Sequence, residues 1–193
     1  MRKIDKKLNG TYEKILQTTI KLIQEEGSQK LTMKRVAEKA KVNKALVNYH
    51  FTGKENLIKE AVSVMSKDLW TVFDVLDNYE LDARIRFEKF LINFLKQILK
   101  FKESIKYLLY EGKFLFDEQK QFSAYLKNIG LPKIKKTIFE IAGEKDNTIG
   151  DVLTLQIFGS LVLPNIIVTE KNDIFKFVLP DIEKQVQVLM ERL

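Results

Sequence analysis

Six neighbouring residues have side chains that can bind nucleic acid, and their spacing suits the outer face of one short helix. The set consists of Asn43, Lys44, Ala45, Asn48, Tyr49 and His50. In the major groove of DNA, lysine can donate to guanine O6 and N7, and asparagine can pair with adenine. Lysine and tyrosine can also bind phosphate. These residue types therefore favour recognition of double-stranded DNA.

The residues around this set predict the elements that position it. In residues 31–57, apolar and polar positions alternate as in two short helices joined by a tight turn. The apolar positions that should face inward are Val36, Ala37, Ala40, Val42, Val47 and Phe51. This pattern is typical of a helix-turn-helix, whose second helix enters the DNA groove.

The net charge of the chain lies entirely in its first third. Residues 1–60 contain 14 Lys and Arg against 7 Asp and Glu, whereas residues 61–193 contain 19 of each class. One end is therefore basic, with a net charge of +7, and the rest is neutral. A basic surface alone is often only solvated, but its coincidence with the helix-turn-helix pattern indicates contact with a polyanion.

Other kinds of chemistry find little support in the sequence. One His and no Cys leave no disulfide, no thiolate metal ligand and no Cys nucleophile. Glycine-rich dinucleotide, His-Glu-x-x-His and Gly-x-Ser-x-Gly motifs are absent from the sequence. We therefore expect no catalytic residue, no metal site and no cofactor.

The apolar segments favour a cytoplasmic protein that does not bind membranes. The basic N-terminus lacks the apolar run of a secretory signal. The longest apolar stretch, Ser160–Val168, is interrupted by Pro164 and falls short of the roughly 20 residues that a membrane span needs.

Long apolar-periodic segments predict an all-α protein. Only eight Gly and three Pro occur among the 193 residues, and apolar residues recur three and four apart over long windows. With 45% hydrophobic residues, the chain can bury a sizeable core. We expect an N-terminal three-helix domain at residues 1–53, followed by a larger helical domain at residues 54–193.

Glycine and proline predict where several later helices begin and end. Gly130 and Pro132 should interrupt the helix that precedes them. The two C-terminal helices are expected at about residues 148–169 and 173–193. The last of them should restart at Pro180, with the proline in its first turn.

Residues 8–60 resemble the DNA-binding domain of the TetR family of transcriptional repressors. The resemblance rests on a Thr that begins the second helix, Ala and Val at the turn, a Tyr-His-Phe run, and Lys-Glu at the start of the fourth helix. In this sequence these residues are Thr32, Ala40, Val42, Tyr49, His50, Phe51, Lys54 and Glu55. The resemblance implies a ligand-responsive regulator, a repressor whose homodimer binds a palindromic operator and pairs through its two C-terminal helices.

The resemblance and the spacing together assign two kinds of DNA contact. We expect base reading, with Lys44 and Asn48 setting the specificity, from Lys34, Asn43, Lys44, Ala45 and Asn48. We expect phosphate contacts from Thr32, Lys41, Tyr49, His50 and Lys54. Two alternatives stay open, since Tyr49 can be a surface aromatic and His50 a packing residue.

One position departs from the family pattern. Family members usually carry Gly in the turn before Val42, whereas this chain carries Lys41. A side chain there costs about 1 kcal/mol if the turn needs a left-handed backbone. The same lysine can add a phosphate contact.

The larger domain holds most of the aromatic residues, which favours a pocket for an apolar or aromatic small molecule. Twelve of the 13 Phe and the single Trp follow residue 60. The pocket candidates are Trp70, Phe90, Phe94, Gln97, Phe116 and Gln156. Gln97 and Gln156 lie in apolar surroundings, so each needs a buried partner, either a ligand or the facing subunit. The aromatic residues can equally be plain core.

The expected mechanism has two rivals. Ligand binding should shift the fourth helix and change the separation of the two helix-turn-helix domains in a dimer. This requires that the ligand bind the DNA-binding and released states of the protein with different affinities. A basic helical head can instead bind nucleic acid without sequence preference. A helical body can also serve as a small-molecule enzyme or carrier.

Overall fold

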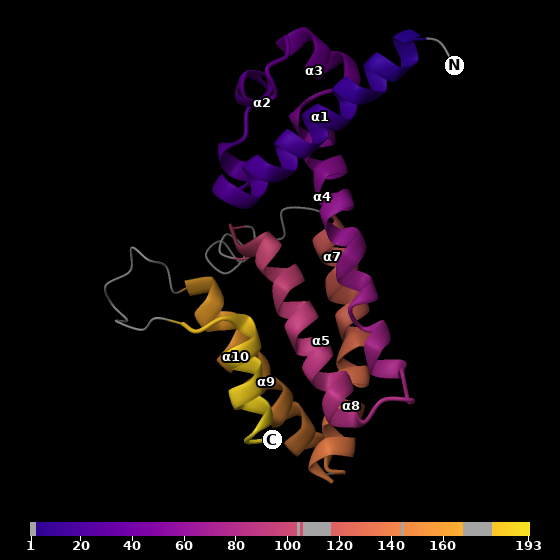
Figure 1. Ribbon diagram of the computed structural model, residues 1–193, viewed down its shortest axis with the longest axis vertical. Helices are drawn as coiled ribbons and strands as arrows, with labels where there is room; N and C mark the ends of the chain where they lie inside the picture. Colours follow the sequence, from indigo (N-terminus) through magenta and orange to yellow (C-terminus); the bar gives the residue numbers. More distant parts are fainter. Residues whose placement is uncertain (1–2, 104, 106–116, 144, 168–178) are drawn as a thin grey trace. The chain divides into compact units, whose positions relative to one another are not determined.

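The computed structural model describes residues 3–103, 105, 117–143, 145–167 and 179–193, which form helices joined by short turns (Figure 1). No strand occurs among these residues, so the all-α class is confirmed. The chain divides into two compact units, which are Met1–Lys67 with Glu103–Glu118 and Asp68–Lys102 with Gln119–Leu193. The first unit extends beyond the expected domain limit at residue 53, and that limit stays a prediction.

In the first unit, a long N-terminal helix packs against two short ones. The helices are α1 (Lys3–Glu26), η1 (Ser28–Lys30), α2 (Met33–Ala40), α3 (Lys44–His50) and the first turns of α4 (Lys54–Thr71). α1 contacts both α2 and α3, and α2 contacts α3 (Figure 1). The two helices of the expected helix-turn-helix are therefore α2 and α3.

The core of the first unit is apolar and enclosed. Ile15 and Ile23 of α1, Val36 and Ala40 of α2, and Val47 of α3 are each at most 1% exposed. Burying such side chains contributes about 1.5–3 kcal/mol for each Val or Ile. The face that the sequence predicts to point inward is thus buried, except that Val42 in the turn is half-buried.

The second unit is a helical bundle. Its elements are η2 (Asp74–Asp77), α5 (Ala83–Ile98), η3 (Leu99–Phe101), most of α7 (Asp117–Tyr125), the π-helical turn η4 (Leu126–Gly130), α8 (Leu131–Ala142), α9 (Asn147–Ile167) and α10 (Ile182–Met190). α5 contacts α8 and α10, while α9 contacts α8 and α10 (Figure 1). α5 therefore holds together both halves of this bundle.

Phenylalanine side chains fill the centre of the second unit. Phe73 packs against Phe90 with 5.1 Å between ring centroids, and Phe87 stacks on Phe90 at 6.1 Å. Phe94 meets Phe158 edge-on at 5.3 Å. Aromatic pairs at such separations add about 0.5–1.5 kcal/mol each beyond the burial of their area. The aromatic layer is therefore a major part of the stability of this unit.

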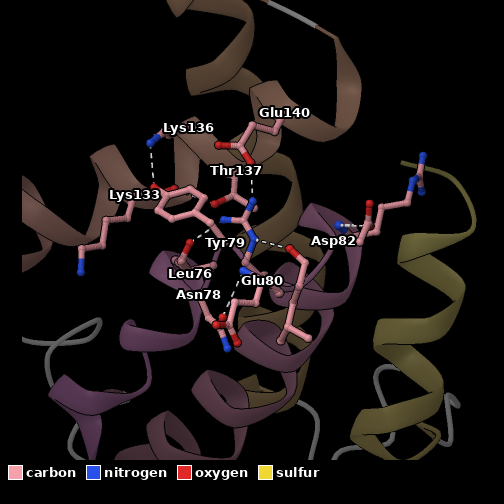
Figure 2. A network of polar contacts seen from close by, with 12 residues as sticks. Leu76, Asn78, Tyr79, Glu80, Asp82, Lys133, Lys136, Thr137 and Glu140 are labelled. Carbon is pink, nitrogen blue, oxygen red and sulfur yellow. Dashed lines mark hydrogen bonds and ion pairs between the residues drawn. The ribbon is translucent and has the colours of Figure 1, made fainter.

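One buried arginine ties the turn after α4 to α8. The guanidinium of Arg86, 3% exposed, donates to the carbonyls of Leu76 and Leu81 and to the carboxylate of Glu140 (Figure 2). The ring centroid of Tyr79 lies 4.7 Å from the guanidinium carbon. Since a buried charge is costly unless it is paired and hydrogen-bonded, these partners explain why Arg86 is tolerated.

The helix that the sequence interrupts at Gly130 continues through it. A π-helical turn, Leu126–Gly130, joins α7 to α8, and Pro132 lies in the first turn of α8. A Cβ at Gly130 would lie 2.8 Å from the ring of Phe73, so only glycine allows this close approach. The π turn changes the hydrogen-bond pattern where the proline lacks a donor. The predicted interruption is therefore wrong.

The two C-terminal prolines occupy different kinds of position. Pro164 lies inside α9 and does not end it. α10 begins at Ile182, and Asp181 caps it by accepting a backbone N–H at 2.8 Å. Pro180 therefore precedes the cap instead of lying in the first turn, which corrects the expected restart. Residues 173–178 of the expected helix lie outside the described residues.

A row of apolar side chains on α9 is uncovered in the single chain. The exposed residues are Ile149, Val152, Leu155, Leu163 and Ile167, with Val188 on α10. By length and composition alone, α9 could cross a membrane, with a mean hydropathy of 1.4 over a window that is 28% buried. A single helix of this kind also occurs in soluble proteins, so hydropathy does not assign its partner.

Candidate nucleic-acid interface

The outward face of α3 carries polar residues that the sequence singles out. Lys44, Ala45, Asn48 and Tyr49 are exposed, whereas Val47 in the same helix is fully buried. A short helix held by one apolar face presents its opposite face to solvent. The structure thus brings three of the base-reading candidates, at positions 44, 45 and 48, onto one accessible surface.

Two of the predicted contact residues also cap helices. Thr32 Oγ1 accepts the backbone N–H of Arg35 at 3.1 Å, where α2 begins. Asn43 Oδ1 accepts the backbone N–H of Ala45 at 2.9 Å, where α3 begins. Caps of this kind contribute about 0.5–2 kcal/mol. While the caps are formed, Asn43 can offer DNA its amide donors, and Thr32 can offer its hydroxyl proton.

Lys41 holds the turn between α2 and α3 in a left-handed conformation. Its φ and ψ are 53° and 48°, and it is the one described residue other than glycine with a positive φ. Its N–H donates to the carbonyl of Glu38 at 3.1 Å, and the N–H of Val42 donates to that of Ala37 at 3.0 Å. These bonds form a Schellman motif, which favours glycine at the left-handed position. The lysine therefore carries backbone strain in an exposed turn.

The other cationic candidates have only weak contacts within the chain. Lys34 lies 3.9 Å from Glu38 with both side chains exposed, a pair that contributes about 0–1 kcal/mol. Lys54 Nζ donates to the carbonyl of Gln29 at 3.5 Å. Lys44 is exposed at the start of α3. Releasing these ammonium groups to an anion therefore costs little.

An aromatic stack fixes the C-terminal end of α3. Tyr12 of α1 lies nearly parallel to Phe51, with 4.9 Å between ring centroids, and meets His50 edge-on at 6.0 Å. His50 meets Tyr49 edge-on at 5.3 Å. The Tyr12 hydroxyl donates to the carboxylate of Glu60 on α4. This hydrogen bond and burial raise the pKa of Tyr12 to about 12, so the hydroxyl keeps its proton near neutral pH.

His50 is more enclosed than the other phosphate candidates on α3. Its side chain is half-buried, and its Nε2 atom is buried without a hydrogen-bond partner. The rings of Tyr12, Tyr49 and Phe51 lie around it. This arrangement is compatible with the packing role left open by the sequence, and phosphate contact by His50 stays a prediction.

The sequence did not point to Tyr12 or Glu60 as part of this region. In the sequence pattern, Tyr12 is simply one of the positions on the apolar face of the first helix. Forty-eight residues separate the two, and no spacing rule links positions so far apart. A polar hollow of about 330 Å³ beside Glu60 likewise has no sequence signature; it is lined by Thr52, Asn56, Lys59, Glu60 and Ser63.

Several ligand-pocket candidates are part of the second unit's core. Phe90 and Phe94 are buried, at 0% and 6% exposure, within the aromatic layer. Trp70 is half-buried and meets Phe122 and Tyr125 edge-on, at 5.5 and 4.9 Å between centroids. Phe116 lies outside the described residues. The plain-core alternative thus accounts for Phe90 and Phe94.

The two candidate glutamines differ in their surroundings. Gln97 Oε1 is buried without a hydrogen-bond partner, as expected for an amide in apolar surroundings. Gln156 is exposed because it lies on the uncovered side of α9. Gln156 is therefore not buried within the single chain, and a partner for it from a ligand or the facing subunit stays a prediction. No group of three or more metal-binding side chains occurs where the structure describes the chain.

The N-terminal region matches a family model. Residues 15–61 match the model of bacterial regulatory proteins of the tetR family. This segment contains all of α2 and α3, together with the Tyr49-His50-Phe51 run. No curated protein sequence matches the chain.

Solved structures share the fold over nearly the whole chain. A TetR-like transcriptional regulator from Rhodococcus sp. RHA1 has a TM-score of 0.63 at 12% identity, covering 94% of this chain and 92% of that one. A transcriptional regulator from Aquifex aeolicus VF5 has a TM-score of 0.56 at 20% identity, covering 94% and 96%. The fatty acid degradation regulator FadR from Bacillus halodurans has a TM-score of 0.60 at 17% identity, covering 94% and 93%.

Sequence and fold agree on one assignment. The structural likenesses, at such low identity, show the fold alone. The family model covers the helix-turn-helix, in which the predicted inward residues Val36 and Val47 are buried and the predicted outward residues of α3 other than His50 are exposed. The N-terminal region therefore carries the helix-turn-helix domain of the tetR family of bacterial regulatory proteins, and the whole chain shares its fold with solved transcriptional regulators.

Proposed function

We propose that the protein is a sequence-specific transcriptional repressor that a small molecule releases from DNA. The observation that carries this proposal is the exposed polar face of α3, opposite a fully buried Val47. Lys44 and Asn48 lie four residues apart on that face. Their side chains can distinguish guanine and adenine in the major groove. A surface that binds only phosphate needs cations but gains little from an exposed asparagine.

Phosphate contacts would hold α3 in register on the duplex. Tyr49 is 72% exposed beside the base-reading face. Lys54 stands at the first position of α4, where the positive end of the helix dipole also favours anions. Each neutralised phosphate should add about 0.9 to the slope of log affinity against log salt. These contacts supply affinity without choosing a sequence.

We further propose that two copies pair through α9 and α10. Leu155 is 73% exposed on α9, and Val152 and Leu163 beside it are also uncovered. Apolar rows of this kind favour burial against another surface. Asn165 Nδ2 donates to Gln185 Oε1 at 2.6 Å, so the amide pair holds α10 against α9. Such a dimer carries two reading helices, whose half-sites should lie about 34–36 Å apart.

The proposed effector is an apolar or aromatic molecule with one hydrogen-bond donor. Gln97 lies one helical turn beyond Phe94, at the edge of the aromatic layer, and Trp70 lies three residues before Phe73, near the end of α4. An unpaired buried acceptor costs about 1–3 kcal/mol, which a donor on the effector would recover. Effector binding weakens DNA binding only if its affinity differs between the two states of the protein.

Selection of bound duplexes from a random-sequence pool tests the proposal. The purified protein, at physiological ionic strength, should enrich one palindrome whose half-sites lie about one turn of DNA apart. Binding all duplexes with equal affinity would instead support a protein without sequence preference. That outcome would overturn the proposed function.

A further inference from the structure

Three helices of the first unit meet at one tyrosine. Tyr12 belongs to α1, its ring stacks on Phe51 and touches His50 at the end of α3, and its hydroxyl reaches Glu60 on α4. Phe51 is 1% exposed, so the stack is anchored in the core. The side chain of Tyr12 therefore joins the C-terminal end of α3, the proposed reading helix, to α4.

The hydrogen bond from Tyr12 to Glu60 can restrict how α4 is oriented relative to α3. Apolar residues of α4 such as Leu57 and Ala61 are fully buried, and their packing resists separation of the helices. The hydrophobic effect has no preferred direction, whereas a hydrogen bond to a carboxylate is both directional and strengthened by the charge. The Tyr12–Glu60 bond is thus suited to fix rotation of α4 against the reading helix.

The position of Glu60 makes this rotation relevant to DNA binding. Glu60 lies beyond the first turn of α4, and α4 continues as one helix from Lys54 to Thr71, from the first compact unit into the second. In a dimer, the angle at which each reading helix is held on α4 contributes to the separation of the two reading helices. A looser angle would let that separation vary.

We propose that Tyr12 and Glu60 are positioning residues that set which half-site spacing the dimer accepts. The inference rests on the proposed binding of a palindromic operator. Tyr12 acts through His50 and Phe51 and need not touch DNA itself. Without the Tyr12 hydroxyl, the ring can still stack on Phe51, but the orientation of α3 relative to α4 is no longer fixed before DNA binds. Each reading helix must then be ordered on binding, and operators with slightly different half-site spacings become easier to bind.

The test compares Tyr12→Phe with a matched removal of another hydroxyl. Tyr79→Phe is the control, because the Tyr79 hydroxyl accepts from Lys136 at 2.7 Å within the second unit. Both variants and the wild type are titrated with the selected operator and with versions that have one or two base pairs added or removed between half-sites. Thermal melts of all three proteins report any general loss of stability.

We expect Tyr12→Phe to bind the original spacing about two- to tenfold more weakly, the range of one hydrogen bond, while binding to altered spacings falls less or rises. Tyr79→Phe should keep the wild-type spacing profile. Glu60→Gln keeps an acceptor but loses the charge, so it should give an intermediate profile. This second variant also covers the case in which Tyr12→Phe fails to fold.

The outcomes separate this inference from the proposed function. If the wild type selects no palindrome, the proposed function fails and the inference falls with it. If the wild type selects a palindrome but Tyr12→Phe and Glu60→Gln keep its spacing profile, only the inference is overturned. An equal loss at every spacing would show that the tyrosine merely stabilises the fold, which also overturns it.

Discussion

The Oδ1 atom of Asn43 accepts the backbone N–H of Ala45 at 2.9 Å, so a candidate for base reading is bound to its own helix. A carbonyl oxygen has a second lone pair, but the cap fixes the orientation of the whole amide. The Nδ2 donors are then the groups of Asn43 free to meet a base acceptor. Capping and the proposed base reading by Asn43 are therefore separable by substitution.

Replacing Asn43 should separate these two roles. Asn43→Ala should lower the free energy of unfolding by about 1 kcal/mol because the cap is lost. Asn43→Ser keeps a capping oxygen and should restore most of that stability, while it removes the amide donors. Denaturant titration measures the stability, and fluorescence anisotropy with the selected operator measures binding. Wild-type affinity in Asn43→Ser would contradict base reading by Asn43.

Replacing Lys41 by glycine should stabilise the protein. Glycine adopts a φ of 53° without steric cost, so Lys41→Gly should raise the free energy of unfolding by about 0.5–1 kcal/mol. Lys39→Gly, in the last turn of α2, should lower it by about 1 kcal/mol and is the control. Chemical denaturation of both variants measures the change. A less stable Lys41→Gly would mean that contacts of the lysine outweigh the strain.

Base-reading and phosphate-binding lysines should respond differently to truncation. Lys44→Ala and Asn48→Ala should cost about 1–3 kcal/mol on the preferred sequence and relax specificity. Lys54→Ala should weaken binding to all duplexes alike and reduce the salt slope by about 1. Lys89→Ala, an exposed lysine of α5, should have no effect. The division into base-reading and phosphate-binding residues fails if the variants at positions 44, 48 and 54 lose affinity equally on every sequence.

Removing the unpaired amide of Gln97 should stabilise the protein without effector. Gln97→Leu replaces a buried unsatisfied oxygen with apolar surface, so the free energy of unfolding should rise by about 1 kcal/mol. Gln121→Leu changes an exposed amide of α7, away from the proposed interface, and should shift stability by less than about 0.5 kcal/mol. Differential scanning calorimetry compares the two. A destabilised Gln97→Leu would indicate that the oxygen already has a partner in solution.

A charge on the exposed face of α9 should separate the proposed dimer. Leu155→Lys leaves the single chain's core untouched, because this side chain is 73% exposed, but it would bury an ammonium group in the interface. Ile85→Lys, at a similarly uncovered apolar residue of α5, should remain dimeric. Sedimentation equilibrium measures both. A dimeric Leu155→Lys would locate the interface elsewhere, and recovery of the wild type with membranes would favour a lipid partner for α9.

The structure of the helix-turn-helix, α2 and α3, could be predicted from the sequence because it depends on residues close together in the chain. The buried positions Val36 and Val47 and the caps at Thr32 and Asn43 lie within a few turns of one another, where helical periodicity and side-chain chemistry decide the structure. The sequence left open whether the turn needs a left-handed backbone, and Lys41 has one. The roles of these residues toward DNA remain predictions.

The second unit was harder to predict because its details depend on distant neighbours. Gly130 and Pro132 have the residue types of helix breakers, yet packing against Phe73 and a π turn keep the chain helical. Gln156 lies in an apolar segment, and only the packing of α9 decides that it faces outward. The sequence predicts which residues are apolar, but not which apolar surface the rest of the chain covers.

In the proposed mechanism, the length of α4 determines how large a tilt of this helix would release DNA. Its 18 residues form a rod of about 27 Å, at about 1.5 Å per residue. Tilting such a rod by about 7° around one end moves the other end by about 3.4 Å, the rise of one base pair. An effector that tilts α4 through this small angle would therefore displace a reading helix by the rise of one base pair along the DNA.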